Sequence, residues 1–280
     1  MGFFNRGPVV PVLRLSGAIG MAAPLRPGLS IATLAGPIER AFSMSKAGSV
    51  CVVINSPGGS PVQSSLIFKR LRQLADEKGK KIYVFCEDVA ASGGYYLAVA
   101  GDEIYADPSS IVGSIGVISA SFGLDRAIEK LGITRRVYTA GTNKGSLDPF
   151  QPEKPDDIER LKTVQRNVHD VFIGVVKDRR LGKLKGADAE LFSGAFWSAT
   201  DALELGLIDG ISDVRSKMRE LHGENVRLKV VPIEKGWFAT RFRKLPSVLD
   251  GLGGGSPGLA IADDLVSAVE IRALWSRFGL

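Results

Sequence analysis

The chain has 280 residues, of which 45% are hydrophobic and 24% charged, and it carries a formal net charge of +6. This length and composition suit one large soluble α/β domain and exclude a disordered or fibrous chain. A basic balance allows nucleic acid or an anionic membrane as partner. The sequence has no zinc-finger spacing, aromatic RNA-binding pattern or long Lys/Arg run, so we expect no nucleic-acid binding.

Strands and helices are predicted to alternate from the start of the chain. Apolar runs predict strands, and apolar residues at helical spacing predict helices. The predicted strands are 9–15, 50–54, 81–86, 103–106, 116–119, 135–139 and 226–231. The predicted helices are 31–46, 61–78, 93–100, 123–131, 155–180, 200–205 and 212–222. This alternation favours crossover connections and a largely parallel sheet.

The chain changes character after Pro232, so we expect a domain at 1–232, a basic aromatic stretch and Gly-rich linker at 233–258, and an amphipathic C-terminal helix at 259–280. We predict no signal peptide, and no transmembrane helix because no apolar run reaches roughly 20 residues. We therefore expect a cytoplasmic protein. The stretch 235–245 and the tail are candidates for peripheral contact with the inner face of the membrane. The alternative is a tail that packs on its own domain or on a neighbour.

Two cysteines, Cys51 and Cys86, lie inside predicted buried strands. Two cysteines at this separation form neither a metal pattern nor a disulfide framework. We interpret both as inert core thiols. The sequence therefore predicts no metal site and no cofactor.

Two glycine pairs follow predicted buried strands: Gly58-Gly59 after 50–54, and Gly93-Gly94 after 81–86. Sites in open α/β sheets lie beyond the carboxyl ends of strands. Backbone N–H groups in such turns can form an oxyanion hole, although ordinary strand-to-helix turns explain the glycines equally well. Ser92 is correspondingly either a helix N-cap or a nucleophile.

A serine nucleophile needs a base. His169 and His222 lie outside the glycine-rich loops and are better explained as structural or surface residues, which argues against a Ser-His-Asp triad. Lys144 follows the predicted strand 135–139 in a polar loop. Its local context favours an exposed loop lysine, because a lysine acts as a base only where burial or a nearby cation lowers its pKa.

Four motifs in order resemble the signal peptide peptidase A family, whose members are Ser-Lys dyad peptidases with the fold of the Clp protease subunit and the crotonases. The resemblance covers roughly 9–215 and implies an α/β fold of repeated β-β-α units. The motifs are Asn55-Ser56-Pro57-Gly58-Gly59, Ala91-Ser92-Gly93-Gly94-Tyr95-Tyr96, Gly113-Ser114-Ile115-Gly116-Val117, and Lys144 with Asp148-Pro149-Phe150.

The resemblance also implies roles for these residues. Ser92 matches the nucleophile, Lys144 the general base, and Ser114 a serine that orients the lysine. The N–H of Gly93 and that of Gly59 or Gly58 match the oxyanion hole. A downstream segment at 192–209 matches a scaffold that closes the domain.

The family further implies a ring-like homo-oligomer with active sites near subunit interfaces, where the serine and the lysine can come from neighbouring protomers. We expect peptide substrates, such as fragments of signal peptides or membrane proteins. Many members carry an N-terminal membrane anchor, and none is predicted here. Two alternatives stay open: a crotonase-like acyl-CoA enzyme, which bound CoA would favour, and a non-catalytic membrane-associated scaffold, which a fully assembled Lys144→Ala variant that behaves like wild type on every peptide would favour.

Overall fold

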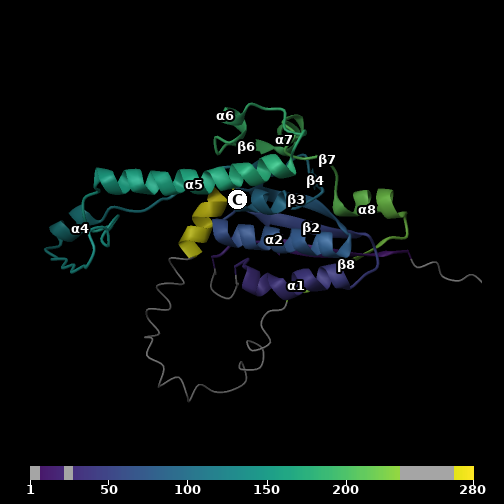
Figure 1. Ribbon diagram of the computed structural model, residues 1–280, viewed down its shortest axis with the longest axis horizontal. Coiled ribbons are helices and arrows are strands. Elements are labelled where there is room, and N and C mark those ends of the chain that lie inside the picture. Colours follow the sequence, from purple (N-terminus) through teal and green to yellow (C-terminus); the bar gives the residue numbers. More distant parts are fainter. Residues whose placement is uncertain (1–6, 22–27, 234–267) are drawn as a thin grey trace, which may run out of the picture.

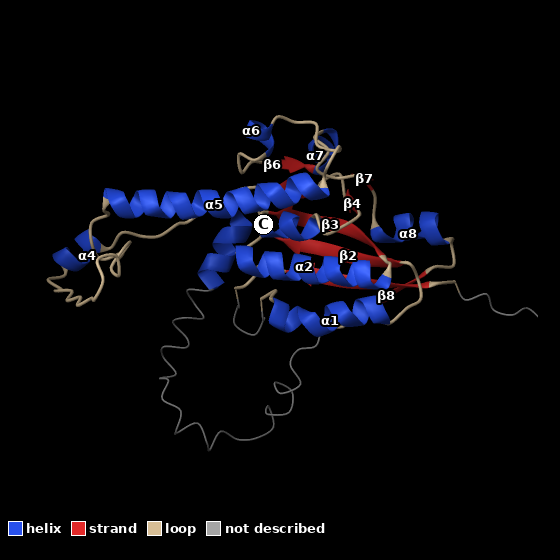
Figure 2. Ribbon diagram, in the orientation of Figure 1, coloured by secondary structure: helices blue, strands red, loops and turns tan. Residues whose placement is uncertain are grey.

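An eight-stranded sheet forms the centre of the computed structural model, which describes residues 7–21, 28–233 and 268–280 (Figures 1 and 2). Its strands are β1 (Val9–Ser16), β2 (Ser49–Ser56), β3 (Lys81–Ala91), β4 (Glu103–Ala106), β5 (Ile111–Gly113), β6 (Phe196–Ser198), β7 (Gly210–Ile211) and β8 (Arg227–Val230). The order is β6-β5-β3-β2-β1-β8, with β4 beside β3 and β7 beside β4. Every pairing is parallel except that of β5 with β6.

The helices are α1 (Ile31–Ser43), α2 (Pro61–Lys78), α3 (Gly93–Ala98), α4 (Asp125–Lys130), α5 (Pro155–Arg179), α6 (Asp188–Leu191), α7 (Ala199–Glu204) and α8 (Val214–His222). The ends of α2 follow from local chemistry. Ser60 caps its first turn, Pro61 occupies the first helical position, and Gly79 ends it in a left-handed conformation. Figure 1 shows α1, α2 and α5 running alongside the sheet, while α4 and the start of α5 extend beyond it.

On the edge away from β2, β3 pairs with two different strands in turn. Tyr83–Cys86 pair with β4, and Val89–Ala91 pair with β5. The register with β2 shifts at Asn55, whose side-chain oxygen accepts a hydrogen bond from the Val89 N–H at 3.3 Å. A bulge of this kind redirects the strand beyond it. It therefore sets the position of the residue that follows Ala91, which is Ser92.

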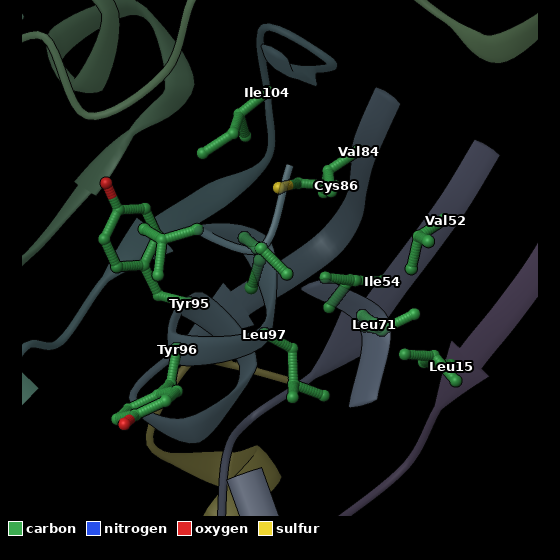
Figure 3. Close-up of a cluster of buried hydrophobic side chains, with 14 of the residues drawn as sticks. Leu15, Val52, Ile54, Leu71, Val84, Cys86, Tyr95, Tyr96, Leu97 and Ile104 are labelled. Atoms are coloured by element: carbon green, nitrogen blue, oxygen red, sulfur yellow. The ribbon is translucent and has the colours of Figure 1, made fainter. Parts of the chain in front are cut away.

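The larger hydrophobic core lies between the sheet and helices α1, α2, α3 and α5 (Figure 3). It includes Leu71 of α2, Leu97 of α3 and Phe172 of α5. A smaller cluster covers the opposite face, where Met218 of α8 is fully buried. Both free cysteines lie in these clusters, and burial raises the pKa of each thiol to about 12. The prediction of buried core thiols is confirmed.

Most predicted elements are present, and helix 61–78 and strand 103–106 have the predicted bounds. The strands predicted at 116–119 and 135–139 are wrong. Neither segment pairs with a strand in the described part of the chain, and Ile118 and Val137 are exposed. An apolar run becomes a strand only where a neighbour accepts its backbone hydrogen bonds. The short strands β5, β6 and β7 were not predicted, because two or three residues show no periodicity.

The C-terminal segment folds back onto the domain. Residues 268–276 are helical. Phe278 is buried against Val89 and Ala91 of β3, with its ring centroid 5.2 Å from that of Phe196. Trp275 packs beside it. The predicted amphipathic helix is therefore present where it is described, with these two rings on the domain rather than free for a membrane.

The basic stretch 235–245 and residues 259–267 lie outside the described residues, so membrane contact through them stays a prediction. Among the helices that the structure describes, none combines the length and the apolar character needed to cross a membrane.

Candidate active site

Ser92 forms the sharp turn between β3 and α3, with φ of 52° and ψ of −120°. A positive φ is strained for a residue with a side chain, so the surrounding structure must hold it. The Ser92 N–H donates to Gly113 O (2.8 Å), and its carbonyl accepts from Tyr96 N–H (2.9 Å). Its side chain makes no capping hydrogen bond. The N-cap role that the sequence left open is therefore not the role of this hydroxyl.

The two glycine pairs meet at this turn. A Cβ on Gly58 would stand 2.8 Å from both the Ser92 Cβ and the Gly93 nitrogen. A Cβ on Gly94 would stand 2.5 Å from the carbonyl oxygen of Ser56. Any side chain at either position would force the two loops apart. The glycines are thus required by close backbone approach, beyond their freedom to turn.

Two backbone N–H groups at this junction are candidate oxyanion donors, those of Gly59 and Gly93. Neither donates a hydrogen bond within the described residues. A Cβ on Gly93 would lie 3.3 Å from the Gly59 nitrogen, so the two loops place these groups close together. The Gly58 N–H instead donates to Ser56 Oγ at 3.2 Å. Of the two glycines that the sequence left as alternatives, the geometry favours Gly59.

An apolar cleft of about 300 Å³ opens at Ser92. It lies between α2 and α5, with Gly116 and Val117 on a further side. Its largest apolar side chains are Val62, Leu66, Tyr96, Val168, Val171 and Phe172. Of the two tyrosines that follow the glycine pair, Tyr96 lines the cleft, whereas Tyr95 is buried and donates its hydroxyl to Leu207 O (2.7 Å). The cleft can hold an extended apolar segment next to the serine.

Ser114 follows β5, next to the strand that delivers Ser92. It is buried, with φ of 52°, and its N–H donates to Ala195 O at 2.7 Å. His169 of α5 contacts the Ile115 carbonyl through Nε2 at 3.0 Å, which ties α5 to this wall of the cleft. His222 contacts Ser49 Oγ at the start of β2. Neither histidine lines the cleft, which agrees with the prediction that both are structural or surface residues.

Lys144 is exposed and does not line the Ser92 cleft. It lies in a turn between α4 and α5, and Ser146 of that turn donates to Asp157 in the first turn of α5 (2.8 Å). Asp157 precedes the cleft residue Val168 by eleven residues, or about 16 Å along a helix axis. Figure 1 shows this end of α5 beyond the sheet. The structure therefore does not bring Lys144 to Ser92 within one chain.

Two cleft residues on α2 were missed by the sequence reasoning, Ser64 and Lys69. Ser64 is fully buried, and its Oγ donates to Ser60 O (2.9 Å). The same Ser64 Oγ would lie 2.5 Å from a Cβ on Gly93. Lys69 lies farther along the same helix and is exposed. Lys69 follows Leu66 by three residues and Val62 by seven, and this helical spacing is a signal that could have found it, whereas Ser64 lies two residues from each and shows no such signal.

The segment predicted to close the domain does so through buried polar contacts. Arg180 is 2% exposed, donates twice to Gly206 O, and pairs with Asp209 at 2.6 Å. Burial alone would raise the pKa of Asp209. The hydrogen bonds from Arg180 and Lys183 outweigh burial and hold that pKa below its usual value. Trp197 of β6 packs against Gly113, whose carbonyl binds Ser92.

Comparison with known proteins gives a family. The model of peptidase family S49 matches residues 75–227. The chain is 28% identical over 289 residues to the chloroplastic serine protease SPPA of Arabidopsis thaliana, covering 93% of this chain and 41% of that protein. It resembles a solved structure of a mutant of the membrane-bound stomatin-specific protease 1510-N, with a TM-score of 0.51, 15% identity, and coverage of 81% of this chain and 98% of that one. That likeness shows the Clp/crotonase-like α/β fold.

A second relative bears a different name. The chain is 54% identical over 277 residues to a protein of Brucella abortus (strain 2308) named Na(+)/H(+) antiporter NhaA, covering 97% of this chain and 37% of that protein. The chain thus spans well under half the length of both curated relatives. Identity of this extent implies that the antiporter-named protein includes a region of the same fold.

Proposed function

Because the chain belongs to peptidase family S49, the family of signal peptide peptidase A, we propose that it is a serine endopeptidase acting through an acyl-enzyme on Ser92. One observation carries the proposal. Ser92 stands on a strained turn, next to the loops that carry the N–H groups of Gly59 and Gly93, and it lines an apolar cleft. A nucleophile, oxyanion donors and a binding surface are the parts that acyl transfer needs.

The proposed chemistry has two halves. Ser92 Oγ attacks the scissile carbonyl while a neutral lysine takes its proton, and the developing oxyanion is held by the N–H groups of Gly59 and Gly93. The C–N bond then breaks, and the lysine returns the proton to the leaving amine. In the second half a water gives its proton to the lysine and attacks the ester carbonyl. The bond from that carbon to Ser92 Oγ then breaks and the lysine returns the proton to Oγ, which releases the acid and restores Ser92.

We assign the base to Lys144 of a neighbouring copy in a homo-oligomer. Within one chain this side chain is exposed and lies away from the cleft. A lysine acts as a base where burial disfavours its charge. An interface that seats the turn of Lys144 over the Ser92 cleft of the next copy would supply both burial and proximity. Ser114, which follows the strand next to the one that leads to Ser92, is proposed to orient the incoming lysine amine.

The substrates we propose are short or unfolded peptides with apolar side chains. The cleft is lined mainly by aliphatic and aromatic groups, which suit apolar side chains of a peptide that is free to extend its backbone beside Ser92. Fragments of signal peptides and of membrane proteins have this composition. The antiporter name of the Brucella relative is a reason to include membrane-protein fragments among the test peptides.

Covalent labelling tests the proposal directly. Assembled protein is treated with a fluorophosphonate, and the labelled residue is identified by mass spectrometry. We expect label on Ser92, none in Ser92→Ala, and full label in Ser65→Ala, which changes another serine of the same cleft. Absence of label at Ser92 in correctly assembled protein would contradict the proposed nucleophile. Detection of bound CoA would instead favour an acyl-CoA enzyme.

A further inference from the structure

The lining of the Ser92 cleft includes a charged side chain that the proposed function does not explain. Among the residues that line it in the described part of the chain, Lys69 is the one that carries a charge. The remaining lining residues are apolar side chains, glycines and serines. An apolar peptide would need no cation there, so the position of Lys69 requires a separate account.

Lys69 lies on the cleft-facing side of α2, in line with Val62 and Leu66. Ser64 marks the catalytic end of this wall, since its Oγ would lie 2.5 Å from a Cβ on Gly93. Lys69 follows five residues later, roughly 8 Å along the helix axis. An extended peptide advances about 3.3 Å per residue. Lys69 thus stands level with a group two or three residues from the bond that is cut.

The charge of Lys69 is also uncompensated, unlike that of its neighbours. Arg72 pairs with Asp76 (2.8 Å) and Asp102 (2.9 Å), and Arg70 lies 4.0 Å from Glu39. Lys69 forms no ion pair with any residue that the structure describes. A lysine that only covered apolar surface with its stem would serve equally well on any face of the helix. Lys69 lines the cleft that holds the nucleophile and has no ion-pair partner among the described residues.

We propose that Lys69 determines specificity by recognising a carboxylate on the bound peptide, either an acidic side chain or a free C-terminus. The proposal rests on the proposed peptidase function and adds a substrate class: apolar peptides that carry a negative charge within about three residues of the cleaved bond. Lys69 is exposed, so the contact is screened by water and salt. Exposed ion pairs contribute a factor of roughly two to five.

The test uses matched peptides that differ only in Glu, Gln or Lys at each position within three residues of the cleaved bond. Each peptide is made as a free acid and as an amide, which separates the two sources of carboxylate. We expect wild type to favour one acidic form by about two- to fivefold in kcat/KM, with the preference falling as salt rises. Lys69→Glu should reverse it, and Lys69→Gln should abolish it. Arg70→Gln, a neighbouring cation beside Glu39, should keep it.

The outcomes separate this inference from the peptidase function. If fluorophosphonate labels Ser92 in both wild type and Lys69→Glu but their peptide preferences are identical, the role of Lys69 is refuted and the peptidase function stands. If Lys69→Gln loses cleavage of every peptide equally, Lys69 acts in the chemistry or the fold rather than in selection, which also refutes it. Absence of label in wild type contradicts the peptidase function itself.

Discussion

The Ser92 end of the sheet and the arm, which we define as residues 118–154, are built in opposite ways. At Ser92 backbones meet so closely that glycines are obligatory, and flanking residues such as Ala91 and Tyr95 are fully buried. In the arm large apolar side chains face solvent, including Phe122 at 84% and Tyr138 at 91% exposure. Apolar surface of this kind marks an interaction site. One chain therefore builds the Ser92 turn completely, whereas the arm leaves the proposed base Lys144 exposed and away from the cleft.

The largest expected effect comes from removing either member of the proposed Ser92–Lys144 pair. Ser92→Ala and Lys144→Ala should each lower peptide hydrolysis by about 10⁴- to 10⁶-fold, by analogy with other serine peptidases. Lys130→Ala, which removes a lysine from the same arm, should leave the rate within about twofold, as surface changes usually do.

Mixing the two inactive variants sharpens this result. If Ser92 of one copy uses Lys144 of the next, dissociation and reassembly of the mixture should restore part of the wild-type rate. A mixture as inactive as its components, while mixed oligomers are seen by native mass spectrometry, would show that the pair forms within one chain.

A second prediction concerns a substitution that disrupts the exposed apolar surface of the arm and leaves the Ser92 cleft unchanged. Phe122→Asp would place a carboxylate in the proposed apolar interface, at a cost of about 2 kcal/mol or more, which corresponds to roughly thirtyfold in the assembly constant. We expect smaller particles by light scattering and a matching fall in hydrolysis. Leu181→Asp changes another side chain that is 84% exposed, but outside the arm. It should assemble and cleave normally. Equal behaviour of the two variants would contradict the assigned interface.

A third prediction concerns the stability of the packed domain and should leave the rate of peptide hydrolysis nearly unchanged. Asp209→Asn breaks the pair with Arg180, which is 2% exposed. Loss of one partner of a buried pair costs about 3 kcal/mol. Because the folded-state pKa of Asp209 is depressed, its stabilisation is present above the unfolded pKa near 4 and is lost as pH falls through the folded value.

Urea unfolding from pH 7 down to pH 2 measures that prediction. The difference in unfolding free energy between wild type and Asp209→Asn should be largest near neutrality and should shrink in acid. A constant difference across this range would show that the ion pair does not stabilise the fold. Cleavage by the folded variant at neutral pH should match wild type, because Asp209 does not line the Ser92 cleft.

Local patterns predicted much of the fold correctly. The apolar run at 50–54 and the helical spacing at 61–78 each became the expected element, because the strand is buried on both faces of the sheet and the helix on the face that its period defines. The runs at 116–119 and 135–139 were also predicted as strands, but they pair with no strand in the described part of the chain. Pairing is a property of the neighbours, which a local window does not contain.

The candidate site likewise has one part that the sequence predicted and another that only the structure revealed. The sequence by itself determined Ser92 and the two glycine pairs, since a serine and small residues at the ends of buried strands are local features and the family motifs contain them. Only the tertiary structure decided that Gly59 rather than Gly58 keeps its N–H free, that Lys69 faces the cleft, and that Lys144 lies away from it. These facts depend on which distant segments the packed sheet and helices bring together. The residues next to a position in the sequence do not determine which segments those are.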